Sequence, residues 1–241
     1  MSASHLLHEQ LTRNLNGVRE RITRSAQHSG RSGDGITLVA VTKYFEWPIV
    51  RALLEIGQQD FGENRPQQLI ERAAQLRSEI DSPQPRWHQI GQLQRNKVRA
   101  VLPEAALIHS VDSEKLLERI AQIADETGQT AHVLLQVNTS GEDSKSGFTP
   151  DGVRECLEQW EDLPAVSIQG LMTMAPLIED EAVIRQTFSR LRELRDSLAT
   201  SNRPLRELSM GMSGDFEVAI EEGATIVRVG SALVAGIEGH E

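Results

Sequence analysis

The sequence predicts an α/β protein that folds as a single (β/α)8 barrel, also called a TIM barrel, with an extra helix at its N-terminus. Eight short apolar segments rich in β-branched residues alternate with helical patterns along the 241 residues. This alternation is typical of a parallel sheet, because each parallel strand needs a crossover helix to reach the next. Eight such units in this length favour a closed barrel over an open doubly wound sheet.

The first 28 residues predict an amphipathic helix that packs on the barrel. Apolar residues recur there at three- and four-residue spacing, at Leu7, Leu11, Leu15, Val18 and Ile22. The segment "HSGRSGDG" then ends the helical pattern with glycine and serine. No linker, low-complexity tract or internal repeat follows it, so we expect residues 1–241 to form one domain.

Helical patterns separate the predicted strands. "WPIVRALLEIG" has a proline just inside its start and a glycine just past its end, the usual asymmetry of helices. "DSEKLLERIAQIADETG" also closes on glycine, and "EDEAVIRQTFSRLRELRDSLA" has one mostly apolar face. We expect the strands at residues 37–43, 60–64, 86–91, 107–112, 132–140, 166–174, 206–213 and 225–231. The weakest strand signal is "DFGEN" at 60–64.

Composition argues against several classes of protein. The formal charge is −10 and no basic tract marks a nucleic-acid-binding surface. Cys156 is the only cysteine, so no internal disulfide can form, and its helical setting predicts a buried structural thiol. The N-terminus lacks the apolar stretch of a signal peptide, and no window approaches the ~18 apolar residues of a membrane span. We therefore expect a cytoplasmic protein that binds neither nucleic acid nor membrane.

The predicted strands begin apolar but end polar, and in (β/α)8 barrels the active site forms at those carboxyl ends. Polar residues also mark strand ends simply because the chain meets water there. That explanation fits poorly a lysine and an arginine embedded in the apolar runs "LVAVTK" and "TIVRVG". The polar residues expected at the common mouth are Lys43, Glu63, Asn64, His88, Gln89, Asp112, Asn138, Ser140, Thr173, Ser213, Arg228 and Ser231.

The last predicted strand leads into a candidate phosphate site. Barrels of this type commonly bind a phosphate after strands 7 and 8, where free backbone N–H groups face the anion. Gly230 permits a close approach of the backbone, and the Ser231 hydroxyl can donate. The segment "MSGD" offers a second helix start at Ser213 and Gly214. Plain N-caps by Ser213 or Asp215 are the simpler alternative, but we favour one phosphate site shared by both segments.

Lys43 is one of only four lysines in the chain. A lysine at the end of a buried strand either pairs with a carboxylate or attacks a carbonyl carbon, since burial favours the uncharged amine. With a phosphate site and Arg228 across the mouth, the implied ligand carries an aldehyde and a phosphate. Pyridoxal 5′-phosphate (PLP) and a sugar phosphate both fit. Lys145, in a Gly/Ser-rich loop, is either part of a lid or anion site or an ordinary surface residue. No metal site is predicted.

A set of motifs then points to one family. The stretches are "VAVTKY", "FGENRPQQL", "RWHQIGQLQRNK", "HSVDS", "QVNTSGEDSKSGF", "GLMTMAP" and "LSMGMSGDFEVAIEEGATIVRVGSALVAG". Together they resemble the pyridoxal phosphate homeostasis proteins, which have the fold of the alanine racemase N-terminal domain (fold type III of PLP proteins). The last stretch and "SKSG" are the most specific.

The resemblance implies PLP as the cofactor. Lys43 matches the lysine that forms the internal aldimine, and Arg228 matches the arginine that faces the pyridine nitrogen and weakens PLP as an electron sink. Ser231 stands where the family usually has threonine, and this replacement keeps a hydroxyl group at the position. The sequence "TKYFEW" departs from the family's usual sequence after the lysine. The cofactor-binding residues implied are Lys43, Asn64, His88, Met210, Ser213, Gly214, Arg228, Gly230 and Ser231.

The resemblance also implies a protein without robust catalytic activity, acting in intracellular PLP homeostasis, and we expect no catalytic residue. Racemisation needs a second base, a tyrosine from a partner's β-domain. The only tyrosine here, Tyr44, is adjacent to Lys43, and adjacent side chains on a strand point to opposite faces, so Tyr44 is badly placed for that role. We expect a monomer, with PLP-dependent apoenzymes as possible recipients. A low-activity amino-acid racemase is one alternative. A Schiff-base aldolase acting on a sugar phosphate, with Glu63 or Asp112 as its base, is a less favoured one.

Overall fold

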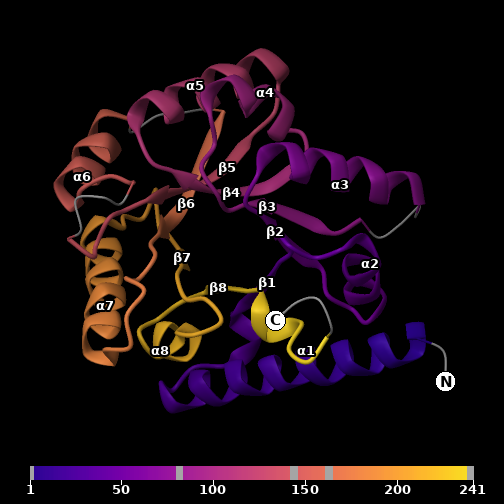
Figure 1. Cartoon of the computed structure of the whole chain (residues 1–241). Helices are drawn as coiled ribbons and strands as arrows, with labels where there is room; N and C mark the ends of the chain where they lie inside the picture. Colours follow the sequence, from indigo (N-terminus) through magenta and orange to yellow (C-terminus); the bar gives the residue numbers. More distant parts are fainter. Residues whose placement is uncertain (1–2, 80–83, 142–145, 161–164, 238–241) are drawn as a thin grey trace.

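The computed structural model describes residues 3–79, 84–141, 146–160 and 165–237, and it forms a closed barrel of eight parallel strands (Figure 1). Strand order follows the chain, and β8 pairs with β1 to close the barrel. The predicted (β/α)8 fold is therefore confirmed. Lys145 lies outside the described residues. The strands are β1 (Thr37–Val41), β2 (Asp60–Glu63), β3 (Arg86–Gln89), β4 (Ala105–Val111), β5 (Ala131–Gln136), β6 (Val166–Met172), β7 (Glu207–Ser209) and β8 (Ile226–Val229).

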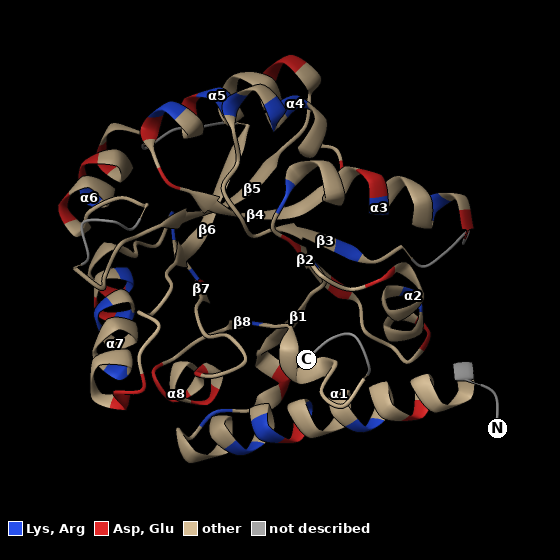
Figure 2. Ribbon diagram, viewed as in Figure 1, with Lys and Arg blue, Asp and Glu red and all other residues tan. Residues whose placement is uncertain are grey.

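Helices surround the barrel and carry most of the charged residues, while the strands between them are largely uncharged (Figure 2). Helix ends follow the expected signals: Pro48 lies in the first turn of α2, and Gly128 ends α5 with a left-handed φ of 64°. The helices are α1 (Ala3–His28), α2 (Trp47–Glu55), α3 (Pro66–Glu79), α4 (Val98–Val101), α5 (Glu114–Thr127), α6 (Pro150–Gln159), α7 (Glu181–Leu198) and α8 (Phe216–Glu221). Within the described part of the chain, none is long and apolar enough to cross a membrane.

The extra helix α1 lies across the outside of the barrel, alongside α2 and α8 (Figure 1). Its apolar stripe is buried, with Leu11, Leu15, Val18 and Ile22 all below 5% exposure. Three residues past its end, the Arg31 guanidinium donates to the carbonyl oxygens of Ile220 in α8 and Ala224 after it. The helix thus closes the outside of the barrel where β8 meets β1.

The strands have two faces, because successive side chains point to opposite sides. The face toward the helices belongs to a large apolar core. The face toward the barrel axis holds a small apolar cluster of Val39, Leu107, Leu134, Met172 and Ile226. Polar groups occupy much of the remaining axial space, and they lead to the candidate site.

Candidate functional site

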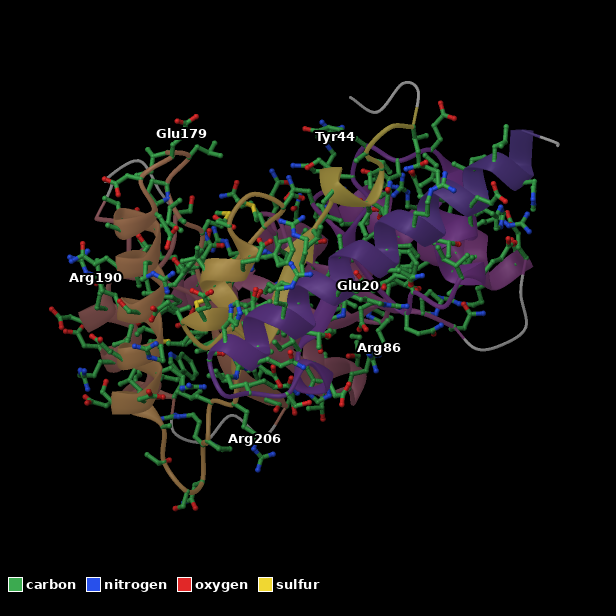
Figure 3. The ribbon with its side chains drawn as sticks, turned by 90° about the horizontal axis from the view of Figure 1, so that it is seen from below. Glu20, Tyr44, Arg86, Glu179, Arg190 and Arg206 are labelled. Atoms are coloured by element: carbon green, nitrogen blue, oxygen red, sulfur yellow. The ribbon has the colours of Figure 1, made fainter. Side chains whose placement is uncertain are left out.

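A cavity of about 950 Å³ opens at the carboxyl ends of the strands. Figure 3 shows Tyr44 and Glu179, which follow β1 and β6, at this end of the molecule, with Arg86 and Arg206 at the other. Seven of the nine residues predicted to bind cofactor line the cavity: Lys43, Asn64, Ser213, Gly214, Arg228, Gly230 and Ser231. His88 and Met210 do not.

Lys43 lies in a turn beyond β1 and not in the strand itself. β1 ends at Val41, and the Phe45 N–H donates to the Thr42 carbonyl oxygen at 2.8 Å to close the turn. The expectation that a buried strand encloses the amine is therefore wrong, because Lys43 is exposed at the cavity mouth. The strand that contains the apolar run "LVAV" ends two residues before the lysine, and the last buried residue before the lysine is Thr42.

The turn also changes the place of Tyr44. Strand alternation predicted that its ring points away from Lys43, but the alternation ends with β1. The Lys43 Nζ lies 4.9 Å from the centre of the Tyr44 ring, within reach of a cation–π contact, and Tyr44 lines the same cavity with 75% of its surface exposed.

Arg228 supplies a buried cation at the cavity wall. Its side chain comes from β8 on the axial face, and the residue is only 4% exposed. Nη1 donates to the Ser209 hydroxyl at 2.6 Å and Nη2 donates to the Thr173 carbonyl oxygen at 3.1 Å. Burial lowers the pKa of Arg228 to about 10, and the nearby Asp215 charge opposes that shift. The guanidinium is therefore still charged at neutral pH.

A chain of hydrogen bonds runs from Arg228 through the barrel interior. The Ser209 hydroxyl also contacts His109 Nδ1 at 2.8 Å. On the other side of the same ring, His109 Nε2 contacts His88 Nδ1 at 2.9 Å. His88 Nε2 then contacts Asp60 Oδ1 at 3.0 Å. Asp60 begins β2, so the chain crosses from the cavity to the opposite end of the barrel. His88 thus lies below the cavity, as one link in this chain.

The protonation states along this chain follow from its ends. Burial raises the pKa of Asp60, but hydrogen bonds from His88 and Arg86 outweigh that effect and the net pKa is lowered. A carboxylate only accepts, so His88 donates from Nε2. Burial, reinforced by the charges of His88 and Arg228, lowers the pKa of His109 well below its usual value, so His109 is neutral. A neutral imidazole donates from one ring nitrogen and accepts at the other, so His109 links His88 to Ser209.

The two segments predicted to share a phosphate site are linked directly. The Gly230 N–H donates to the Ser213 hydroxyl oxygen at 3.1 Å. Asp215 accepts from the Met212 N–H at 2.5 Å, and neither Ser213 nor Asp215 caps α8 with its side chain. The plain-cap alternative therefore does not describe this loop. Gly214 and Ser231 are exposed toward the cavity on either side of the link.

Of the two residues predicted as a base for the aldolase alternative, only one lines the cavity. Asp112 lines the cavity. Glu63 is fully buried behind the barrel wall, where it pairs with Arg72 of α3 and accepts from the Thr42 hydroxyl. Burial raises the pKa of Glu63 despite these partners. Glu63 therefore has no access to a ligand in the cavity.

Several functional candidates were not found from the sequence. Gln136, Met174 and Met212 line the cavity, and Ser209 holds Arg228. Ser209, not Met210, faces the barrel axis, and Met210 is fully buried in the core toward the helices. Two-residue alternation is the signal that distinguishes such neighbours, but it must be anchored to a known axial residue.

Comparison with known proteins agrees with this geometry. A family model described as the alanine racemase N-terminal domain matches residues 13–237. A relative from Aquifex aeolicus (strain VF5), named pyridoxal phosphate homeostasis protein, is 40% identical over 91% of this chain and 95% of its own. PipY of Synechococcus elongatus PCC7942 is 36% identical over 92% of this chain and 99% of its own, with TM-scores of 0.83 for its structure without PLP and 0.79 for the one with PLP bound.

A more distant structure is similar to this chain in fold alone. Alanine racemase from Clostridium difficile 630 has a TM-score of 0.72 at 16% identity and is covered over only 55% of its length. That likeness concerns the barrel alone. The barrel and its matching family model define this chain as a member of the alanine racemase N-terminal domain family. Within it, the chain belongs with the pyridoxal phosphate homeostasis proteins, the name carried by relatives that are 40% and 39% identical over more than 90% of both chains.

Proposed function

We propose that this chain binds PLP in the cavity at the carboxyl ends of the strands and acts in intracellular PLP homeostasis. The observation that carries the proposal is that an exposed amine, a buried cation and a loop with a hydroxyl group line one cavity of about 950 Å³, at Lys43, Arg228 and Ser213. PLP supplies an aldehyde with which a lysine amine condenses, releasing one water. PipY, whose structure carries bound PLP, is similar over nearly its whole length.

Each group has a distinct task in this proposal. Lys43 provides the amine for covalent attachment. Arg228, fixed by Ser209 and Thr173, presents an N–H donor and a positive charge to the ring nitrogen, which keeps that nitrogen unprotonated. The linked loops at Ser213 and Gly230, with Ser231 and Gly214 beside them, receive the phosphate. Asn64 forms a side wall, whereas His88 acts only through the hydrogen-bond chain.

We propose a carrier without robust turnover. Lys43 and Tyr44 are exposed, and Leu177 at the same rim is 96% exposed, so the cavity is open to solvent. Catalysis usually benefits when the active site excludes water, so this open cavity favours a carrier over an enzyme. An open mouth suits release of PLP to recipient apoenzymes. The protein would act as a cytoplasmic monomer, with the whole of residues 1–241 serving as one cofactor-binding domain.

Weak racemase activity is the second candidate, and one contact favours it. The Tyr44 ring lies 4.9 Å from the Lys43 amine, so a phenol stands beside the attachment point. A Schiff-base aldolase is less supported, because Glu63 is excluded from the cavity and leaves Asp112 as the remaining base of the two.

Titration of the purified protein with PLP, followed by absorbance, tests the proposal. We expect a visible band from covalently attached PLP in the wild type and in the control Lys97→Ala, which removes a lysine away from the cavity, but not in Lys43→Ala. Deuterium exchange of amino-acid α-protons, followed by NMR, tests turnover. Absence of the band in the wild type contradicts PLP attachment, and exchange well above that of free PLP contradicts the non-catalytic role.

A further inference from the structure

The turn that carries Lys43 is held from behind by α3. Lys43 and Tyr44 are its central residues, between Thr42 and Phe45. The Arg72 guanidinium donates from Nη1 to the Thr42 carbonyl oxygen at 2.7 Å and from Nη2 to the Phe45 carbonyl oxygen at 2.5 Å. One planar group therefore contacts both ends of the turn.

A second side chain of α3 contacts the middle of the same turn. The Gln68 amide donates from Nε2 to the Lys43 carbonyl oxygen at 3.2 Å. Gln68 and Arg72 are four residues apart, so they project from the same face of the helix. Three carbonyl groups of the turn thus accept hydrogen bonds from one helix face.

The Arg72 fork is itself fixed. It forms a buried ion pair with Glu63 Oε1, and the Thr42 hydroxyl donates to the same oxygen at 2.5 Å. Glu63 is fully buried and Arg72 is 8% exposed. Nη1 donates both to Glu63 and to the Thr42 carbonyl oxygen, and a guanidinium is planar with fixed donor directions, so the carboxylate orients the whole group, Nη2 included. The other Glu63 oxygen, Oε2, has no hydrogen-bond partner among the described residues, so the contacts at this carboxylate converge on one atom.

We propose that Arg72, oriented by Glu63, is a positioning residue that fixes the direction in which Lys43 presents its amine to the cavity. The inference rests on the proposed function, since it takes this amine as the point of PLP attachment. The Lys43 side chain is exposed, so its order must come from the backbone that carries it. Arg72 and Gln68 act on that backbone from outside the cavity and do not line it.

The variants must separate positioning from folding. Arg72→Met alone leaves the Glu63 carboxylate buried without its counter-ion, which risks unfolding. The double variant Arg72→Met/Glu63→Gln removes both charges and keeps the volumes, and such replacements of buried pairs are often tolerated. Arg72→Lys keeps the charge but loses the fork. Arg77→Met is the matched control, because Arg77 lies on the same helix with an exposed side chain paired to Glu104.

Two measurements on these variants test the proposal. Amide hydrogen exchange without PLP should rise about 10- to 100-fold at residues 43–46 in the double variant, the factor expected for lost hydrogen bonds to a charged group. Borohydride trapping over time should show covalent attachment to Lys43 slowed by about 10-fold or more. Arg72→Lys should fall between, and Arg77→Met should match the wild type. In a Lys43→Ala background, the double variant should not further change non-covalent PLP retention.

The outcomes separate this inference from the proposed function. A folded double variant with wild-type exchange and wild-type attachment overturns the positioning role. The positioning role is also overturned if the double variant loses as much PLP retention in the Lys43→Ala background as it does when Lys43 is present. A general structural defect would then explain the effect. If exchange rises but the wild type itself never attaches PLP, the bracing of the turn stands and the proposed function fails.

Discussion

Arg228 donates to the Ser209 hydroxyl at 2.6 Å, and this contact joins the cavity wall to a buried hydrogen-bond chain that ends at Asp60. Ser209→Ala removes an acceptor from a buried guanidinium. We expect the free energy of unfolding to fall by about 1–3 kcal/mol, the usual cost of an unsatisfied buried polar group, and PLP affinity to fall with it. Urea denaturation checks the stability. Ser189→Ala, on the exposed face of α7, should change it little. A Ser209→Ala variant with wild-type stability and affinity contradicts this role of the chain.

The hydrogen-bond chain also predicts a pH dependence of stability. The pKa of His109 is lowered by burial, so below pH ~6.5 the unfolded state binds a proton at this residue that the folded state does not. Stability contributed by neutral His109 is therefore present above that pH and is lost as pH falls, at a slope of up to about 1.4 kcal/mol per pH unit. Urea denaturation between pH 7 and 5 should show a shallower loss for His109→Gln. An unchanged slope contradicts the assignment.

Cys156 is expected to be inert in the folded protein. It is fully buried in α6, and burial, reinforced by the charge of Glu114, raises the pKa of its thiol to about 11. Only the thiolate reacts with a disulfide reagent. We therefore expect labelling by such a reagent at pH 8 to be at least ~100-fold slower in buffer than in urea. Fast labelling of the native protein would show that this helix opens readily.

Gly91 leaves space for Asn64 at the cavity wall. A Cβ at position 91 would overlap the backbone and side-chain oxygens of Asn64, and both residues line the cavity. Gly91→Ala should therefore displace Asn64, cost about 1–3 kcal/mol of stability and weaken PLP binding. Gly17→Ala, in α1 with nothing near the added methyl group, should instead be neutral or stabilising. Calorimetry and PLP titration of both variants compare the two positions.

The sequence predicted most of what periodicity controls. All eight strands form within or next to the apolar segments found between the helical patterns. Each strand is buried between the helices and the barrel axis, so its segment has to be apolar. Lys43 and Arg228 stood out because charge is costly in an apolar run. Both line the cavity.

The remaining features of the site depend on contacts between residues that lie far apart in the chain, and local sequence patterns do not reveal such contacts. β7 has only three residues, too few to show which of Ser209 and Met210 faces the axis. The turn after β1 is held at the Thr42 carbonyl oxygen by Arg72, which is 30 residues from Thr42 in the chain. The hydrogen-bond chain from Arg228 to Asp60 joins five strands, and its contact between His109 and Ser209 spans 100 residues. Such contacts arise only when the barrel closes.

The most direct test of PLP attachment at Lys43 is borohydride reduction of the PLP-treated protein, followed by mass mapping of its peptides. We predict one pyridoxyl group per chain, on the peptide that contains Lys43, and little on peptides that contain Lys97 or Lys115. A label spread over exposed lysines, or a Lys43 peptide that stays unmodified at saturating PLP, would show that Lys43 is not the attachment site.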